Sequence, residues 1–173
     1  MVCSVSRPRR IAVIGRAGSG KSTAAVALGS ALGLPVVHLD QLYWTSDWRP
    51  VESDRFEAAH QAAVAAETWV IDGGYTSPGL PSRIRRADLV VITEAPLAVC
   101  LYRVIRRTIL HRHRSRADRP VGADEQFSLA FLIWIIRWQG NHPDLRGEVL
   151  AEDPEVDIVI VRGAADLERL AAS

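Results

Sequence analysis

Continuous apolar segments that alternate with helical segments predict an α/β fold, in which helices cover both faces of a parallel sheet in three layers. A second observation agrees with this: a glycine-rich loop connects the first apolar segment, residues 11–14, directly to a helical segment. The third is size, because 173 residues without repeats or linkers correspond to one domain. We therefore expect a single α/β domain over residues 1–173.

The expected strands are short and apolar, as buried parallel strands should be. They cover residues 11–14, 36–39, 69–71, 89–93 and 157–161. The second strand is followed by an irregular aromatic segment that ends at Pro50, and the third ends at Asp72-Gly73-Gly74. Ligands of parallel sheets bind at the carboxyl ends of the strands, so the polar residues that follow each strand are the candidates for function.

The expected helices follow from alanine content, apolar periodicity and end signals. They cover residues 21–32, 53–67, a long segment after Pro96, 124–138 and a C-terminal segment. Gly33 ends the first helix, and Ser53 is a good N-cap for the second. Pro120 breaks the third, and Asp166 helps to open the last. Apolar residues of the third helix recur at helical intervals, which places them on one face: 97, 100, 101, 104, 105 and 109.

The charge of the chain is concentrated in one segment. The net charge is +1, but seven arginines and one aspartate lie between residues 103 and 119. That segment carries +6, so the rest of the chain carries −5. A basic cluster on a slightly acidic body indicates one anionic ligand bound at one place. General coating of nucleic acid would require a more basic molecule, and specific DNA binding is not expected.

Other features of composition bear on the compartment. The longest apolar run, residues 129–136, is far shorter than the ~20 residues of a membrane-spanning helix. No apolar signal-peptide core follows the basic residues 1–10. Cys3 and Cys100 lack metal-binding spacing, which favours a reduced compartment and inert thiols. We expect a cytoplasmic protein, a monomer or homodimer, without a membrane partner.

The loop after the first strand matches the phosphate-binding pattern G-x-x-x-x-G-K-[ST] without a mismatch. The matching residues are Gly15, Arg16, Ala17, Gly18, Ser19, Gly20, Lys21 and Ser22. Glycines let backbone N–H groups and the helix N-terminus surround phosphate oxygens. Lys21 is the single lysine beside 20 arginines, and it supplies a compact charge for the β- and γ-phosphates. Ser22 supplies a hydroxyl for Mg²⁺, so the loop predicts binding of ATP or GTP with Mg²⁺.

Carboxylates follow three of the predicted strands at the ligand edge. Asp72 can hold Mg²⁺ directly or through water, or it can simply make the turn before two glycines. Glu94 is the second candidate for Mg²⁺. Asp40 can take a proton from an acceptor hydroxyl or bind Mg²⁺ through water, or it can be a loop carboxylate bonded to its own backbone. Asp88 begins a strand at the opposite edge, where a structural role is expected.

Aromatic residues follow Asp40 closely. Tyr43, Trp44 and Trp48 can wall an acceptor pocket by stacking, although such aromatics are often core residues. His38 lies within the second strand and is interpreted as a structural histidine.

The arginine-rich segment can form a helical lid over a triphosphate. Arg103 and Arg107 are one helical turn apart and share a face. The segment continues with Arg112, Arg114, Arg116 and Arg119. Arginine forks stabilise the charge of a phosphoryl group during transfer, whereas the alternative is a solvated basic helix face.

The order of the motifs resembles that of a bacterial adenylate-kinase-like family whose members are often labelled DNA topology modulation proteins. The resemblance covers nearly the whole chain and rests on GRAGSGKST, HLDQLYW followed by Trp-Arg-Pro, WVIDGGY, RIRRADLVV, EAP and the arginine-rich segment. It implies a P-loop NTPase of the nucleoside or nucleotide kinase type, with a parallel sheet of order 2-3-1-4-5.

The resemblance also implies roles for particular residues. It carries over residues 15–23, including Thr23, as the ATP loop, Asp72 as the acidic residue, and roughly 103–126 as the lid. It places residues 162–165, which include Arg162 and Gly163, near the adenine. The chain departs from the family at Gly74, where Asn is common, and at Glu94, where Asp is usual.

Three functions agree with these features. The first is a kinase that uses MgATP to phosphorylate a small acceptor, which is a nucleoside, a nucleotide or a metabolite. Its catalytic candidates are Lys21, Asp40, Arg103, Arg107 and Arg116. Asp40 favours a hydroxyl acceptor, a nucleoside or metabolite, over a nucleoside monophosphate. The second is an NTP-binding regulatory module that acts on DNA or a protein partner, and the third is a kinase for RNA or DNA ends. No helix-turn-helix, zinc site or basic aromatic sheet face favours the second or third.

Overall fold

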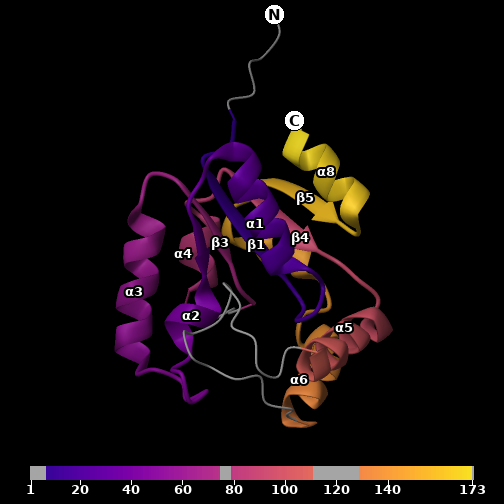
Figure 1. Cartoon of the computed structure of the whole chain (residues 1–173). Helices are drawn as coiled ribbons and strands as arrows, with labels where there is room; N and C mark the ends of the chain where they lie inside the picture. Colours follow the sequence, from indigo (N-terminus) through magenta and orange to yellow (C-terminus); the bar gives the residue numbers. More distant parts are fainter. Residues whose placement is uncertain (1–6, 75–78, 111–128, 173) are drawn as a thin grey trace, which may run out of the picture.

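A computed structural model describes residues 7–74, 79–110 and 129–172, and Figure 1 shows their arrangement around a central sheet. The sheet has five strands: β1 (Arg10–Gly15), β2 (Val36–His38), β3 (Trp69–Asp72), β4 (Leu89–Thr93) and β5 (Asp157–Val161). All neighbouring strands are parallel, and their order is β2-β3-β1-β4-β5. The predicted α/β class and strand order are therefore confirmed.

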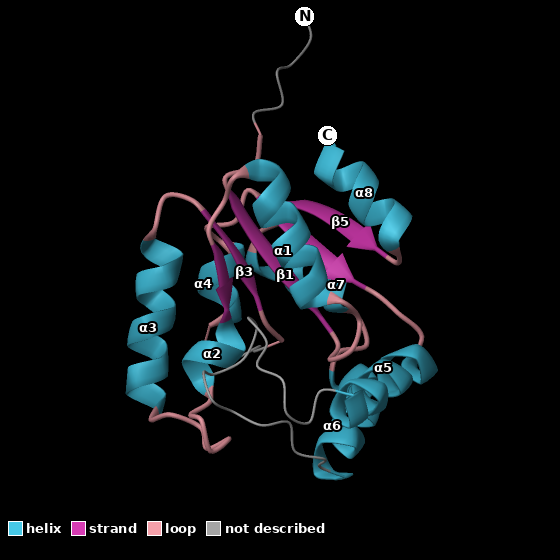
Figure 2. Cartoon of the chain, viewed as in Figure 1, coloured by secondary structure: helices cyan, strands magenta, loops and turns pink. Residues whose placement is uncertain are grey.

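Helices cover both faces of the sheet, which is why the strands read as continuous apolar runs (Figure 2). On one face, α1 (Lys21–Leu32) and α8 (Ala164–Ala172) pack on β1, β3, β4 and β5. On the other face, α3 (Ser53–Ala65), α4 (Leu80–Ile84) and α7 (Leu145–Glu152) pack around Ile71 and Val90. Fully burying a side chain such as Leu28 or Ile71 contributes about 1.5–3 kcal/mol.

The strand register brings the carboxyl ends of the strands to one edge. Asp72 of β3 lies opposite His38 of β2 on one side and opposite Val13 of β1 on the other. Gly15 at the end of β1 lies opposite Thr93 at the end of β4. α5 (Leu97–Leu110) and α6 (Leu129–Asn141) lie together beyond this edge (Figure 1).

Several elements differ from the sequence prediction. The second strand ends at His38, and the aromatic segment begins with a short helix, α2 (Leu39–Tyr43). Neither α4 nor α7 was expected, because helices of five and eight residues are too short to show periodicity. Asp144 caps α7 by accepting a hydrogen bond from the Gly147 N–H at 2.8 Å. The N-cap of α3 is Glu52, one residue before the expected Ser53.

The apolar face predicted for α5 is only partly buried. Cys100, Val104 and Thr108 face the protein, whereas Ile105 and Ile109 are exposed. The expected continuation of this helix towards Pro120, and the expected start of the next at residue 124, lie outside the described residues.

At the amino edge of the sheet, Asp88 joins the starts of β4 and β1. Its carboxylate accepts hydrogen bonds from the backbone N–H groups of Arg9 and Arg10 at 2.9 Å and from Arg10 Nε at 3.1 Å. Burial alone would raise the pKa of Asp88, but these hydrogen bonds and the Arg10 charge outweigh it and lower the pKa. The structural role expected for Asp88 is confirmed.

Among the helices in the described ranges, none combines the length and the apolar character that crossing a bilayer requires.

Candidate functional site

The loop between β1 and α1 forms a cradle that only glycine can build at key positions. Gly15 and Gly18 have φ angles of 141° and 82°, in the region that favours glycine. A Cβ atom on Gly15 would lie 2.4 Å from the Thr93 carbonyl oxygen, and one on Gly18 would lie 2.5 Å from the Cys100 carbonyl oxygen. The loop therefore follows the ends of β4 and α5 at a distance that leaves no room for a side chain.

Neighbouring elements hold this cradle in place. From α5, Arg103 Nη1 donates to the carbonyl oxygens of Gly18 and Ser19, both at 3.3 Å. From β4, the Thr93 hydroxyl lies 2.6 Å from the Ser19 hydroxyl, and both are buried. Arg103, predicted as part of the lid, thus contacts the loop backbone directly.

Lys21 lies at the centre of the charged groups. Its Nζ donates to the Arg16 carbonyl oxygen at 3.0 Å. Burial lowers the pKa of Lys21, the negative charges of Asp40 and Asp72 oppose this shift, and the charge of Arg107 adds to it. Three residues predicted separately from the sequence, Asp40, Asp72 and Arg107, therefore act electrostatically on Lys21.

These groups line one cavity of about 360 Å³, which we call the phosphate pocket. It brings together most of the predicted site residues: Ala17, Gly18, Gly20, Lys21, Ser22, Thr23, Asp40, Asp72, Arg103 and Arg107. His38, Gly73, Arg106 and Phe131 also line it. Arg116 lies outside the described residues.

His38 and Asp72 form a buried pair in this pocket. The His38 Nδ1 atom lies 2.6 Å from Asp72 Oδ1, and the two side chains are 7% and 5% exposed. The sequence interpretation of His38 as structural missed this contact with a candidate metal ligand. A signal was present, since both residues end neighbouring strands, but the pairing depends on a register that the sequence does not display.

Arg83 is a second functional candidate that the sequence reasoning did not single out. It is fully buried in α4, and its Nη1 donates to the Gly73 carbonyl oxygen at 3.3 Å. Burial lowers the pKa of Arg83 to about 10, and the charge of Asp72 opposes the shift. Asp72 thus interacts with the positive charges of both Lys21 and Arg83.

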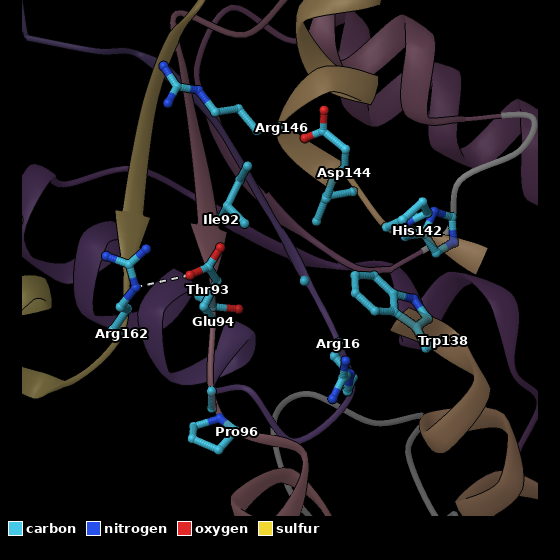
Figure 3. Close-up of a pocket in the computed structure, with 14 residues that line it drawn as sticks. Arg16, Ile92, Thr93, Glu94, Pro96, Trp138, His142, Asp144, Arg146 and Arg162 are labelled. Carbon is cyan, nitrogen blue, oxygen red and sulfur yellow. Dashed lines mark hydrogen bonds and ion pairs between the residues drawn. The ribbon is translucent and has the colours of Figure 1, made fainter. Parts of the chain in front are cut away.

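A second pocket of about 510 Å³ shares no lining residue with the phosphate pocket. Gly15 and Arg16 line it, and the Arg16 guanidinium lies 5.7 Å from the centre of the Trp138 ring. Figure 3 shows Arg162 with Glu94 on one side of this pocket and Trp138 on the other. The Arg162 Nε–Glu94 Oε2 distance is 3.0 Å.

This arrangement separates the two acidic candidates for Mg²⁺. Asp72 lines the phosphate pocket beside Ser22, whereas Glu94 lines the second pocket and pairs with Arg162. Gly163 lines neither pocket.

The aromatic residues after Asp40 pack on one another. The ring centres of Tyr43 and Trp44 are 4.8 Å apart, those of Tyr43 and Phe56 are 5.1 Å apart, and those of Trp44 and Trp48 are 6.0 Å apart. None of them lines the phosphate pocket, so the structure does not bring the expected aromatic wall to the lysine.

The donor set of the phosphate pocket suits Mg²⁺. In the part of the chain that the structure describes, no group of three or more metal-ligating side chains occurs. Mg²⁺ does not require one, because it keeps several waters and binds one or two protein oxygens together with substrate phosphates. The Ser22 hydroxyl and the Asp72 carboxylate are such oxygens, beside a loop shaped for phosphate.

Comparison with solved structures identifies the class of the fold. A gluconokinase from Sinorhizobium meliloti 1021 has a TM-score of 0.58 at 21% identity, covering 95% of this chain and 94% of its own. A shikimate kinase from Acinetobacter baumannii has a TM-score of 0.58 at 16% identity, with coverage of 96% and 90%. A putative kinase from Chloroflexus aurantiacus has a TM-score of 0.57 at 16% identity and 95% coverage of both chains.

The chain therefore has the fold of P-loop kinases. A scan against protein-family models and a search of curated proteins gave no match. The comparisons agree with the kinase-like fold implied by the sequence resemblance and give no support to the DNA topology modulation label.

Proposed function

We propose that this chain is a small-molecule kinase that transfers the γ-phosphoryl group of ATP, with Mg²⁺, to a hydroxyl group of a small acceptor such as a nucleoside or metabolite. The observation that carries the proposal is the phosphate pocket, where Lys21, Asp40 and Asp72 meet beside a glycine cradle. The kinase fold of the similar structures agrees with it. In this proposal residues 1–173 form one kinase domain.

The loop residues 15–23 would bind the nucleotide phosphates through backbone N–H groups, and Lys21 would neutralise the β- and γ-phosphates. Ser22 and Asp72 would hold Mg²⁺, which when bound neutralises charge on the phosphates. The pairing of Glu94 with Arg162 favours Asp72 over Glu94 for this role. Arg162 and Gly163 are assigned to the nucleoside end of ATP.

Asp40 would act as the base. The acceptor oxygen forms a bond to the γ-phosphorus, the bond from that phosphorus to the bridging oxygen of ADP breaks, and Asp40 accepts the hydroxyl proton. Arg103 and Arg107 line the pocket and would stabilise charge on the transferred group, together with Arg116. The lid expected over roughly residues 103–126 is described only as far as residue 110, and the rest of it lies outside the described residues.

A screen for acceptor-dependent ADP release tests the proposal. Purified protein is incubated with MgATP and single members of a panel of nucleosides, nucleotides, sugars and hydroxy acids, with the Lys21→Ala variant as the blank. We expect one class of acceptor to raise ADP release well above the ATP-only rate. Tight ATP binding with no acceptor-dependent turnover across the panel would instead favour the regulatory NTP-binding module.

A further inference from the structure

The His38–Asp72 pair is placed by the sheet itself. His38 ends β2, Asp72 ends β3, and the two residues are directly opposite in the parallel register. Their side chains therefore point to the same side of the sheet edge and meet at 2.6 Å. Within the described residues, this is the hydrogen bond that holds the Asp72 carboxylate.

Fold stability alone is a poor explanation for this pair. Taking a carboxylate and an imidazole out of water costs free energy. Proteins with apolar residues at such positions are often as stable as those with the polar pair, or more stable. The rest of β2 is Val36 and Val37, and the rest of β3 is Trp69, Val70 and Ile71, so the polar pair is confined to the positions that line the phosphate pocket.

The hydrogen bond between His38 and Asp72 restricts the orientation of the Asp72 carboxylate. A carboxylate can rotate about its Cβ–Cγ bond, and one hydrogen bond to Oδ1 fixes its plane. Lys21 and Arg83 place positive charge near Asp72. Groups that orient a ligand in this way typically change metal affinity by ~10- to 100-fold when they are removed.

We infer that His38 is a positioning residue: it holds Asp72 in the orientation in which the other carboxylate oxygen can meet Mg²⁺, or a water of Mg²⁺, on the bound nucleotide. The inference rests on the proposed function, because it requires MgATP in the phosphate pocket. It assigns no contact between His38 and substrate.

The test measures binding and does not depend on turnover. Calorimetry gives the affinity for ATP with excess Mg²⁺ and with EDTA, and the ratio of the two is the Mg²⁺ effect. His38→Leu should reduce this ratio by roughly 10- to 100-fold while leaving the Mg²⁺-free affinity nearly unchanged. His38→Asn keeps an N–H donor near the position of Nδ1 and should retain most of the ratio.

Two further comparisons separate positioning from a general effect of substitution. His60→Leu replaces another buried histidine, which lines neither pocket, and should leave the Mg²⁺ effect unchanged. Asp72→Asn should lose the effect, and adding His38→Leu to it should cause little further loss, because both changes act on one interaction. If His38→Leu does not fold, His38→Gln, which has no donor near Nδ1, replaces it.

An unchanged Mg²⁺ effect in His38→Leu or His38→Gln would overturn the inference, as would an equal loss of affinity with and without Mg²⁺. Failure of the proposed function has a different signature, since the wild-type protein itself would then bind no ATP, or would bind it without acceptor-dependent ADP release.

Discussion

Lys21 is the single lysine of the chain, and it lies where a phosphate-binding charge is needed. Lys21→Ala should weaken MgATP binding by about 10- to 100-fold, because charge-assisted hydrogen bonds to phosphate are lost. Calorimetry measures the affinity, and circular dichroism confirms the fold. Arg169→Ala, a change at an exposed position of α8, is the control and should bind as the wild type does. If Lys21→Ala folds and binds MgATP as tightly as the wild type, Lys21 does not bind the nucleotide phosphates.

Asp40 bears on the nature of the acceptor. It lines the phosphate pocket and is exposed, so an acceptor can reach it. Asp40→Asn keeps the size of the side chain but removes the base, and should lower kcat by ~100-fold or more while ATP binding persists. Once the acceptor is known, steady-state kinetics measure this directly. A loss of only a few-fold would point to an acceptor that is already ionised, such as a phosphate.

The site could be predicted only in part from single residues. The glycine loop, Lys21 and Ser22 have fixed spacing along the chain, so the pattern alone locates them. The hydrogen-bond partner of His38 and the burial of Arg83 depend on how separate elements pack together. No local sequence pattern predicts that packing. Asp72 and Glu94 look equivalent in sequence, since each lies at or just after a strand end, yet they line different pockets.

At the scale of elements, α5 and the phosphate loop act as one unit. Gly18 meets the backbone of Cys100 so closely that a Cβ atom would lie 2.5 Å from its carbonyl oxygen. Gly18→Ala also forces alanine to a φ angle near 82°, and we expect it to lower stability by about 1–3 kcal/mol and to disrupt ATP binding. Denaturant unfolding and calorimetry measure the two effects.

Gly140→Ala is the matched control for this prediction. Gly140 lies in α6, and an added Cβ would meet nothing within 4 Å. This variant should bind ATP normally and be as stable as the wild type or slightly more so, by up to ~1 kcal/mol. If Gly18→Ala and Gly140→Ala had the same stability and the same ATP affinity, the close approach of α5 to the loop would contribute to neither.

The sequence predicts the apolar strands and the long helices better than the short helices. All five strands are found, because each is a continuous apolar run between helical segments. Their order, which the structure confirms, is implied by the family resemblance. The helices α2, α4 and α7 are short and depend on local contacts such as the Asp144 cap. Segments of similar sequence can also form turns, so the sequence does not distinguish the two. Ile105 and Ile109 follow the helical period but are exposed, because periodicity does not reveal which side of α5 meets the protein.

At the scale of the whole molecule, stability should depend on pH through His60. This residue is 1% exposed, and its Nε2 makes no hydrogen bond to the described residues. Burial lowers the pKa of His60 from 6.5 to about 4, and the charge of Arg83 adds to the shift. Between these values the unfolded chain binds a proton that the folded protein does not, so stability falls as pH falls from 6.5 to 4.

The loss should reach at most about 3 kcal/mol for His60. Denaturant unfolding at pH 7 and pH 5 measures it, and the difference between these values should be smaller in His60→Leu than in the wild type. The pKa of Asp88 is lowered from its usual value of 3.8, so Asp88 does not contribute to the pH dependence between pH 4 and pH 6.5. Identical pH dependence in the two proteins would mean that folding does not lower the pKa of His60.

The proposed function requires that the molecule moves a phosphoryl group from ATP to an acceptor. The most direct measurement uses ATP labelled in the γ-phosphate, together with Mg²⁺ and an acceptor from the screen, and follows the label by mass spectrometry. We expect the label to appear on an acceptor hydroxyl in step with ADP formation, and we expect Lys21→Ala to yield almost none. Label found only in inorganic phosphate, whatever acceptor is supplied, would contradict the claim.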